Sequence, residues 1–64
     1  MAITLKAARV NAGLTQEEAA KRIGVSDNII HKWETGKCAP TAKRIPKILE
    51  VYNIKYEDVI ISSS

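Results

Sequence analysis

In this 64-residue chain, Ala19, Ala20 and Ile23 lie at positions i, i+1 and i+4, with charged residues around them, and so form an apolar stripe on one face of a helix. Thr15 precedes this stripe as an N-cap, and Glu18 stands three residues later, where a capping box needs an acidic or amide side chain. Gly24 follows the stripe and can adopt the left-handed conformation that ends a helix. The pattern therefore predicts a helix from Gln16 to Ile23.

A second helix is predicted from Asp27 to Glu34, with Ser26 as its N-cap and Gly36 just beyond its end. Ile30 and Trp33 share one face of this helix. The opposite face is polar: Asp27, Asn28, His31 and Lys32. Two short helices joined by a tight turn at Gly24, with the small Ala20 at their crossing, are typical of a helix-turn-helix. The polar ridge has the character of a helix that lies in a DNA major groove.

The flanking segments predict further helices. The first runs from Met1 to Ala12 with Thr4 as N-cap, and Gly13 ends it. The last runs from Tyr56 to Ile60. Strands have little support, because no Asn-Gly or Asp-Gly turn offers the apolar end of the chain a second strand to pair with.

A fourth helix is predicted between Thr41, another N-cap candidate, and Tyr52. Pro46 conflicts with a helix interior, because it removes a hydrogen bond and clashes with the preceding turn. Either the first turn is irregular, or the helix begins near Ile45 with Pro46 in its first turn. Asn53 is expected to take the left-handed position that closes this helix.

Composition supports one globular domain, residues 1–61, followed by a frayed tail at 62–64. The chain is 45% hydrophobic and 27% charged, and its net charge of +3 favours a polyanionic partner. Cys38 is the single cysteine, so no internal disulfide forms, and a cytoplasmic location fits. No segment is apolar enough for a signal peptide or a membrane span. We expect no metal, because His31 and Cys38 do not complete a site.

The segment LTQEEAAKRIGVSDNIIHKWETGKCAPT, from Leu14 to Thr41, resembles the phage-repressor and Cro-like helix-turn-helix family. The similarity continues over Lys47-Ile48, Ile54 and Val59, nearly the whole chain. It implies a compact all-α, five-helix, lambda-repressor-like domain in a bacterial or phage protein. The second helix of the motif, Asp27 to Glu34, is the one that reads DNA in this family and is called the reading helix below. The sequence departs from the family pattern at Asp27 on the reading helix, at Pro46, and at Tyr52-Asn53, where Leu-Gly is usual. The resemblance also implies an ion pair between Arg9 and Glu34; the alternative is two solvated charges.

The N-terminal residues of the reading helix are the candidates for base contacts. Asn28 suits adenine, Asp27 suits the amino group of cytosine, and Ile29 suits a thymine methyl. For Asp27 the alternative is a role that only stabilises the helix dipole. For Ile29 the alternative is packing against the preceding helix. Lys32, one turn beyond Asn28, is the candidate for guanine or phosphate.

Candidates for contacts to the phosphate backbone lie on both sides of the reading helix. The resemblance implies that Gln16 touches a phosphate from the first turn of its helix, although it is also explained as an exposed polar residue. His31 lies within reach of a phosphate. The resemblance places the following loop and helix start along the backbone, where the candidates are Lys37, Thr41, Lys43 and Arg44. A solvated basic loop is the alternative.

The sequence thus predicts a transcriptional regulator, more specifically a repressor, that binds double-stranded operator DNA. No cofactor is expected. One such domain reads only a half-site, so we expect a homodimer. The candidate dimer surface is the apolar end of the chain: Tyr56, Val59, Ile60 and Ile61. The competing hypothesis is a protein-interaction module such as an antitoxin. An enzyme is disfavoured, because no nucleophile–base pair, carboxylate dyad or glycine-rich phosphate loop is found.

Overall fold

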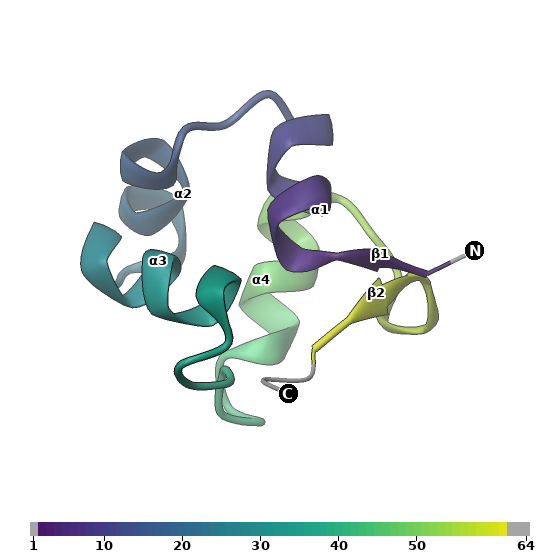
Figure 1. The fold of residues 1–64 in the computed structure, drawn as a ribbon. Coiled ribbons are helices and arrows are strands. Elements are labelled where there is room, and N and C mark those ends of the chain that lie inside the picture. Colours follow the sequence, from purple (N-terminus) through teal and green to yellow (C-terminus); the bar gives the residue numbers. More distant parts are fainter. Residues whose placement is uncertain (1, 62–64) are drawn as a thin grey trace.

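The computed structural model describes residues 2–61. Figure 1 shows α2 and α3 on one side of the molecule and a pair of short strands on the other, with α1 and α4 between them. The elements, in chain order, are β1 Ile3–Thr4, α1 Leu5–Asn11, α2 Gln16–Ile23, α3 Asp27–Thr35, α4 Ile45–Tyr52, the 3-10 turn η1 Tyr56–Asp58, and β2 Val59–Ile60. The described part is therefore mostly helical, in agreement with the predicted all-α class. The predicted number of five helices was wrong, because this part has four α-helices and a small strand pair.

The helix-turn-helix forms as its local signals predict. Thr15 and Glu18 make a reciprocal capping box at the start of α2, with N···O distances of 2.9 and 3.1 Å. Gly24 closes α2 in the left-handed region, at φ +93°. A substitution there is strained although the surrounding space is open. Ser26 then caps α3 through the backbone N–H of Ile29.

The start of α4 corrects the sequence prediction. This helix begins at Ile45 with Pro46 in its first turn, which is the second of the two arrangements considered above. Thr41 is not its N-cap; Arg44 occupies that position and makes no side-chain capping bond. The physical reason is that Pro46 is tolerated only where its missing N–H has no helical partner. At the other end, Asn53 takes the left-handed conformation as predicted, with φ +53°.

The termini of the described chain also differ from the prediction. The expected first helix, from Met1 to Ala12, begins only at Leu5, because Thr4 caps it and the preceding residues form β1. Instead of a helix from Tyr56 to Ile60, one 3-10 turn leads into β2. The two strands pair in parallel, Ile3 opposite Val59 and Thr4 opposite Ile60. Hairpin signals in the sequence could not indicate this pairing, because the partner of β2 is not a neighbouring segment but lies at the other end of the described chain.

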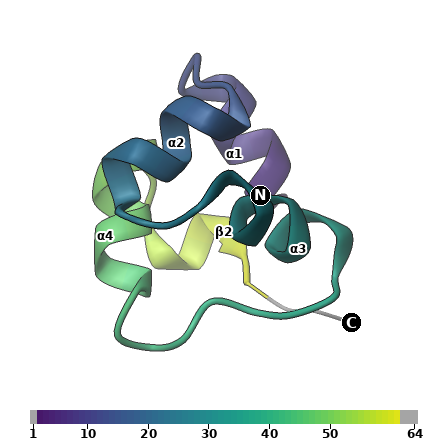
Figure 2. The same cartoon turned by 90° about the vertical axis from the view of Figure 1, so that its left-hand side faces the viewer.

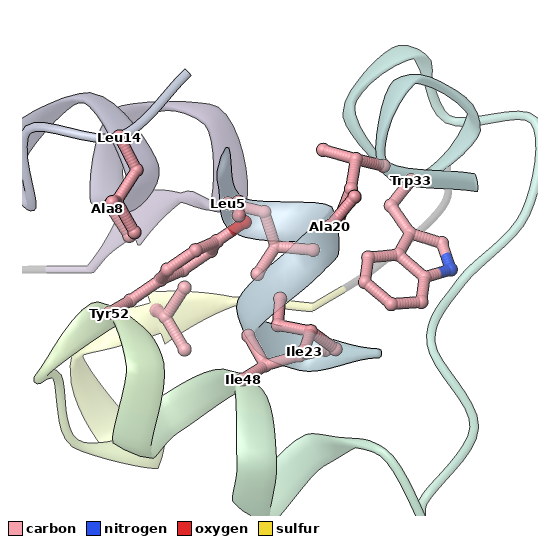
Figure 3. Close-up of a cluster of buried hydrophobic side chains, with 11 residues drawn as sticks. Leu5, Ala8, Leu14, Ala20, Ile23, Trp33, Ile48 and Tyr52 are labelled. Carbon is pink, nitrogen blue, oxygen red and sulfur yellow. The ribbon is translucent and has the colours of Figure 1, made fainter. Parts of the chain in front are cut away.

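A single buried cluster joins the helices to the strand pair. Ile30 on α3 and Ile48 on α4 are its largest fully buried side chains. Ala20 and Trp33 are both buried in this cluster, and Figure 3 shows Tyr52 pointing from α4 towards the α1 residues. Burial raises the pKa of Tyr52 to about 12. The core therefore fixes α3 from behind and leaves its other face outward.

Candidate nucleic-acid interface

The outward face of α3 carries the predicted base-contacting residues. Asp27, Asn28 and His31 are exposed, and Lys32 is half-buried. Ile29 is half-buried and packs against the core cluster, whereas Ile30 is fully buried. The apolar phase of the helix was thus predicted correctly. Ile29 contributes to packing in the free protein, and only part of its side chain is available to a ligand.

A buried ion pair ties the end of α3 to α1. Arg9 donates from Nε to Glu34 Oε2 at 2.6 Å and from Nη2 to Oε1 at 3.1 Å. The two side chains are only 9% and 4% exposed. The hydrogen bond to Glu34 raises the pKa of Arg9, although burial opposes this effect. The pair that the resemblance implied is therefore present, and the alternative of two solvated charges is wrong.

The same pair reaches the start of α2. Arg9 Nη1 donates to the backbone carbonyl of Leu14 at 2.8 Å, directly before the cap of α2. The side-chain amide of Gln16 donates from Nε2 to Glu34 Oε1 at 3.0 Å. Gln16 is accordingly half-buried rather than a freely solvated residue. Sequence reasoning did not predict this link, because its partners lie 18 positions apart on different helices.

The predicted phosphate contacts after α3 lie along one stretch of exposed chain. Lys37, Thr41 and Lys43 are exposed on the loop that joins α3 to α4, which runs along the lower edge of the molecule in Figure 2. Arg44 and Lys47 continue this basic stretch into α4. An open hollow of about 460 Å³ is lined by Thr41, Lys43, Arg44 and Lys47. Lys47 was not among the predicted site residues, although its position one helical turn after Lys43 could have indicated that it belongs to the same basic stretch.

Charge is distributed unevenly over the chain. Half of its ten lysines and arginines lie between residues 32 and 47. The single acidic residue in that range is Glu34, whose charge Arg9 balances. Lys47 makes one exposed ion pair with Glu50, at 3.3 Å, and such pairs contribute little. The loop after α3 and the start of α4 therefore present an excess of positive charge.

The predicted dimer residues do not all lie on the surface. Tyr56 is 63% exposed and Ile60 is 47% exposed. β2, which carries Ile60, lies on the side of the molecule away from α2 and α3 (Figure 1). Ile61 is partly buried against the core. Val59 is only 7% exposed, because alternate residues of β2 face opposite ways and Val59 faces the core. Its side chain therefore belongs to the interior rather than to an outer surface.

The described residues, 2–61, offer neither a membrane-spanning helix nor a cluster of metal ligands. No helix there is long and apolar enough to span a membrane. Within the same range, no group of three or more His, Cys, Asp or Glu side chains is arranged to hold a metal ion. The predicted tail at 62–64 lies outside the described residues.

Comparison with known proteins agrees with this geometry. A family model described as helix-turn-helix matches residues 5–59. A protein of Archaeoglobus fulgidus named as an uncharacterized HTH-type transcriptional regulator is 43% identical over 61 residues, covering 95% of this chain and 86% of the relative. A similarly named protein of Methanocaldococcus jannaschii is 42% identical over 57 residues, with coverages of 89% and 86%. No solved structure gave a significant match.

Proposed function

Because the chain belongs to the Cro and phage-repressor type of helix-turn-helix family, whose members are DNA-binding transcriptional regulators, we propose that it represses transcription by reading operator DNA with α3. The observation that carries this proposal is the two-sided character of α3. Ile30 and Trp33 anchor it in the core, while its first-turn polar residues, Asp27 and Asn28, are exposed. A rigidly held helix with exposed polar residues at its N-terminal end suits the major groove.

In this proposal Asn28 makes the principal base contact, a bidentate pair of hydrogen bonds to adenine. Asp27 accepts from cytosine, and the exposed part of Ile29 meets a thymine methyl. Lys32, one turn further along, contacts guanine or the adjoining phosphate. Each well-made pair of hydrogen bonds discriminates against a wrong base by about 1–3 kcal/mol.

The backbone contacts flank α3 on both sides. Gln16 approaches a phosphate from the start of α2, and His31 another from α3. On the far side the hollow between Thr41 and Lys47 receives a phosphate, supported by its cationic lining and by the uncapped first turn of α4. Lys37 extends this contact along the loop.

The simplest test is to map the surface that a duplex perturbs. Amide shifts of labelled protein, recorded during titration with a duplex selected from a random pool, should change along α3, the following loop and the start of α2. Amides of β2 and η1, on the opposite side of the molecule, should not change (Figure 1). Changes confined to β2 and η1, or no change at low salt, would overturn the proposal.

The phosphate contacts have a separate signature. Lys43→Gln should weaken binding to all duplexes alike and reduce the slope of log K against log salt by about 1. Lys55→Gln is the matched control, since it removes the same charge from an exposed site near η1. Equal effects of the two substitutions would mean that Lys43 acts only through net charge.

A palindromic operator also requires two copies, and we propose a homodimer through Tyr56, Ile60 and Ile61. Sedimentation should show that Ile60→Asp lowers the mass to that of the monomer. Val10→Asp serves as the control, because Val10 is another exposed apolar residue, 56% exposed, on α1. A dimer that survives Ile60→Asp would exclude this surface.

A further inference from the structure

Glu34 bonds simultaneously to a buried cation and to a residue of the proposed DNA interface. Among residues 2–61, its Oε2 accepts from Arg9 alone, at 2.6 Å. Its Oε1 accepts twice, from Arg9 Nη2 at 3.1 Å and from Gln16 Nε2 at 3.0 Å. The Glu34 side chain is 4% exposed, so its carboxylate is not itself available to a ligand on the surface.

These bonds decide which way the Gln16 amide faces. A glutamine amide has two N–H donors and one carbonyl acceptor, and its two orientations are otherwise close in energy. Beside a carboxylate only the nitrogen is tolerated, because the amide oxygen would meet the carboxylate oxygen without a proton between them. One N–H is thus used within the protein, and the second is left as a donor at the start of α2.

Arg9 makes this arrangement compatible with an anion. A lone carboxylate behind Gln16 would repel an approaching phosphate. The two hydrogen bonds from Arg9 balance its charge, and the third, to the carbonyl of Leu14, fixes the guanidinium beside the start of α2. The pair therefore holds Gln16 without presenting net negative charge.

We propose that Glu34, itself held by Arg9, is a positioning residue that orients the Gln16 amide so that an N–H faces the DNA backbone. This inference rests on the proposed function, in which Gln16 contacts a phosphate. It assigns to the buried pair a role in binding in addition to its role in stability. It also explains why Gln16 is half-buried at the edge of an otherwise exposed helix start.

The test is a double-mutant cycle on DNA affinity. The double substitution Arg9→Met/Glu34→Leu removes the carboxylate and its counter-charge together, so net charge and the salt slope stay the same. Gln16→Ala should weaken binding about fivefold to tenfold in the wild type, the effect of one hydrogen bond. It should have no effect in the double-substituted background, because the orientation has already been lost there.

A second cycle with Thr41→Ala provides the matched control. Thr41 belongs to the other proposed phosphate contact and has no hydrogen bond to Glu34, so its effect should be the same in both backgrounds. If the double substitution disturbed the structure in general, the effects of both Gln16→Ala and Thr41→Ala on affinity would differ between the two backgrounds. If Glu34 only positions Gln16, the effect of Gln16→Ala alone should differ. Circular dichroism at the assay temperature checks that each variant is folded.

The free protein gives a readout that does not need DNA. The two side-chain amide protons of Gln16 should be separated in shift more widely in the wild type than in a solvated glutamine, with the carboxylate-bonded proton downfield, and the separation should fall to that of a solvated glutamine in Arg9→Met/Glu34→Leu. Gln16→Ala effects that are equal in the two backgrounds would overturn the inference while leaving the proposed function intact. Absence of binding to any duplex would overturn both, and amide protons that do not change would overturn the positioning role alone.

Discussion

The two sides of this molecule are stabilised differently. On the α2–α3 side, the N-cap side chain of each helix accepts a hydrogen bond from the backbone N–H three residues later, and a buried ion pair ties α3 to α1. On the opposite side, two-residue strands from the two ends of the described chain pair with one another, and η1 begins without a side-chain cap. The proposed reading surface is therefore built from local capping signals and one polar network, whereas the other side depends on long-range strand pairing and apolar burial.

The largest expected effect comes from breaking the ion pair on the α2–α3 side. Glu34→Ala leaves Arg9 as a buried, uncompensated charge and should reduce the free energy of unfolding by about 3–5 kcal/mol. A domain of this size has modest stability, so much of the population should unfold. Urea unfolding followed by circular dichroism measures the loss.

The charge-neutral double substitution Arg9→Met/Glu34→Leu sharpens this result. Replacing both charges by apolar groups should cost far less than removing one of them. Equal losses from the single and double variants would show that the pair contributes through packing rather than through charge compensation.

A smaller effect is expected from the strand side. Val59→Ala removes buried apolar volume opposite Ile3 and should cost about 1–2 kcal/mol. Ile60→Ala, at the next position of the same strand, removes a side chain that is 47% exposed and should change stability by less than about 0.5 kcal/mol. Thermal unfolding of the two variants compares them directly, and a reversed order would mean that the strand faces the other way.

Thr15 caps a helix and Thr41 does not, so their substitutions should differ in their effect on stability. Thr15→Ala removes the capping box of α2 and should cost about 1 kcal/mol. Thr41→Ala should have almost no effect on stability, because α4 begins at Ile45 and Thr41 does not cap it. A similar loss from both substitutions in urea unfolding would restore Thr41 as a helix cap.

The least pronounced effect is expected at alkaline pH. Burial raises the pKa of Tyr52 to about 12 in the folded state, above the ordinary value of 10.0. The folded state therefore favours the neutral phenol, so this contribution to stability is complete below pH 10 and is lost as the pH rises towards 12. Tyr52→Phe should remove that part of the pH dependence, and an unchanged alkaline profile would contradict the assignment.

The same contrast explains how much the sequence could predict. The helix-turn-helix followed from signals within a few residues, namely the Thr15 cap, the left-handed Gly24 and the apolar phase of Ile30 and Trp33. The start of α4 was ambiguous because two local signals, Thr41 and Pro46, pointed to different residues. β2 was missed because apolar alternation over so short a segment does not indicate a partner at the other end of the chain.

For the candidate site, spacing predicted which residues of α3 face outward but not what lies behind them. The Arg9–Glu34 pair came from the family resemblance, since nothing in the spacing of these residues indicates a contact. The bond from Gln16 to Glu34 could be found only once α2 and α3 are placed relative to one another in space. The hollow beside Lys47 likewise depends on how the loop folds back onto the start of α4.

The central proposal is that α3 reads bases. Selection of bound duplexes from a random pool, repeated with Asn28→Ala and Lys43→Gln, tests this role directly. Asn28→Ala should relax the preference at one position of each half-site, while Lys43→Gln should keep the selected sequence and weaken all binding alike. An identical selected sequence from the wild type and from Asn28→Ala, or no enriched sequence at all, would contradict it.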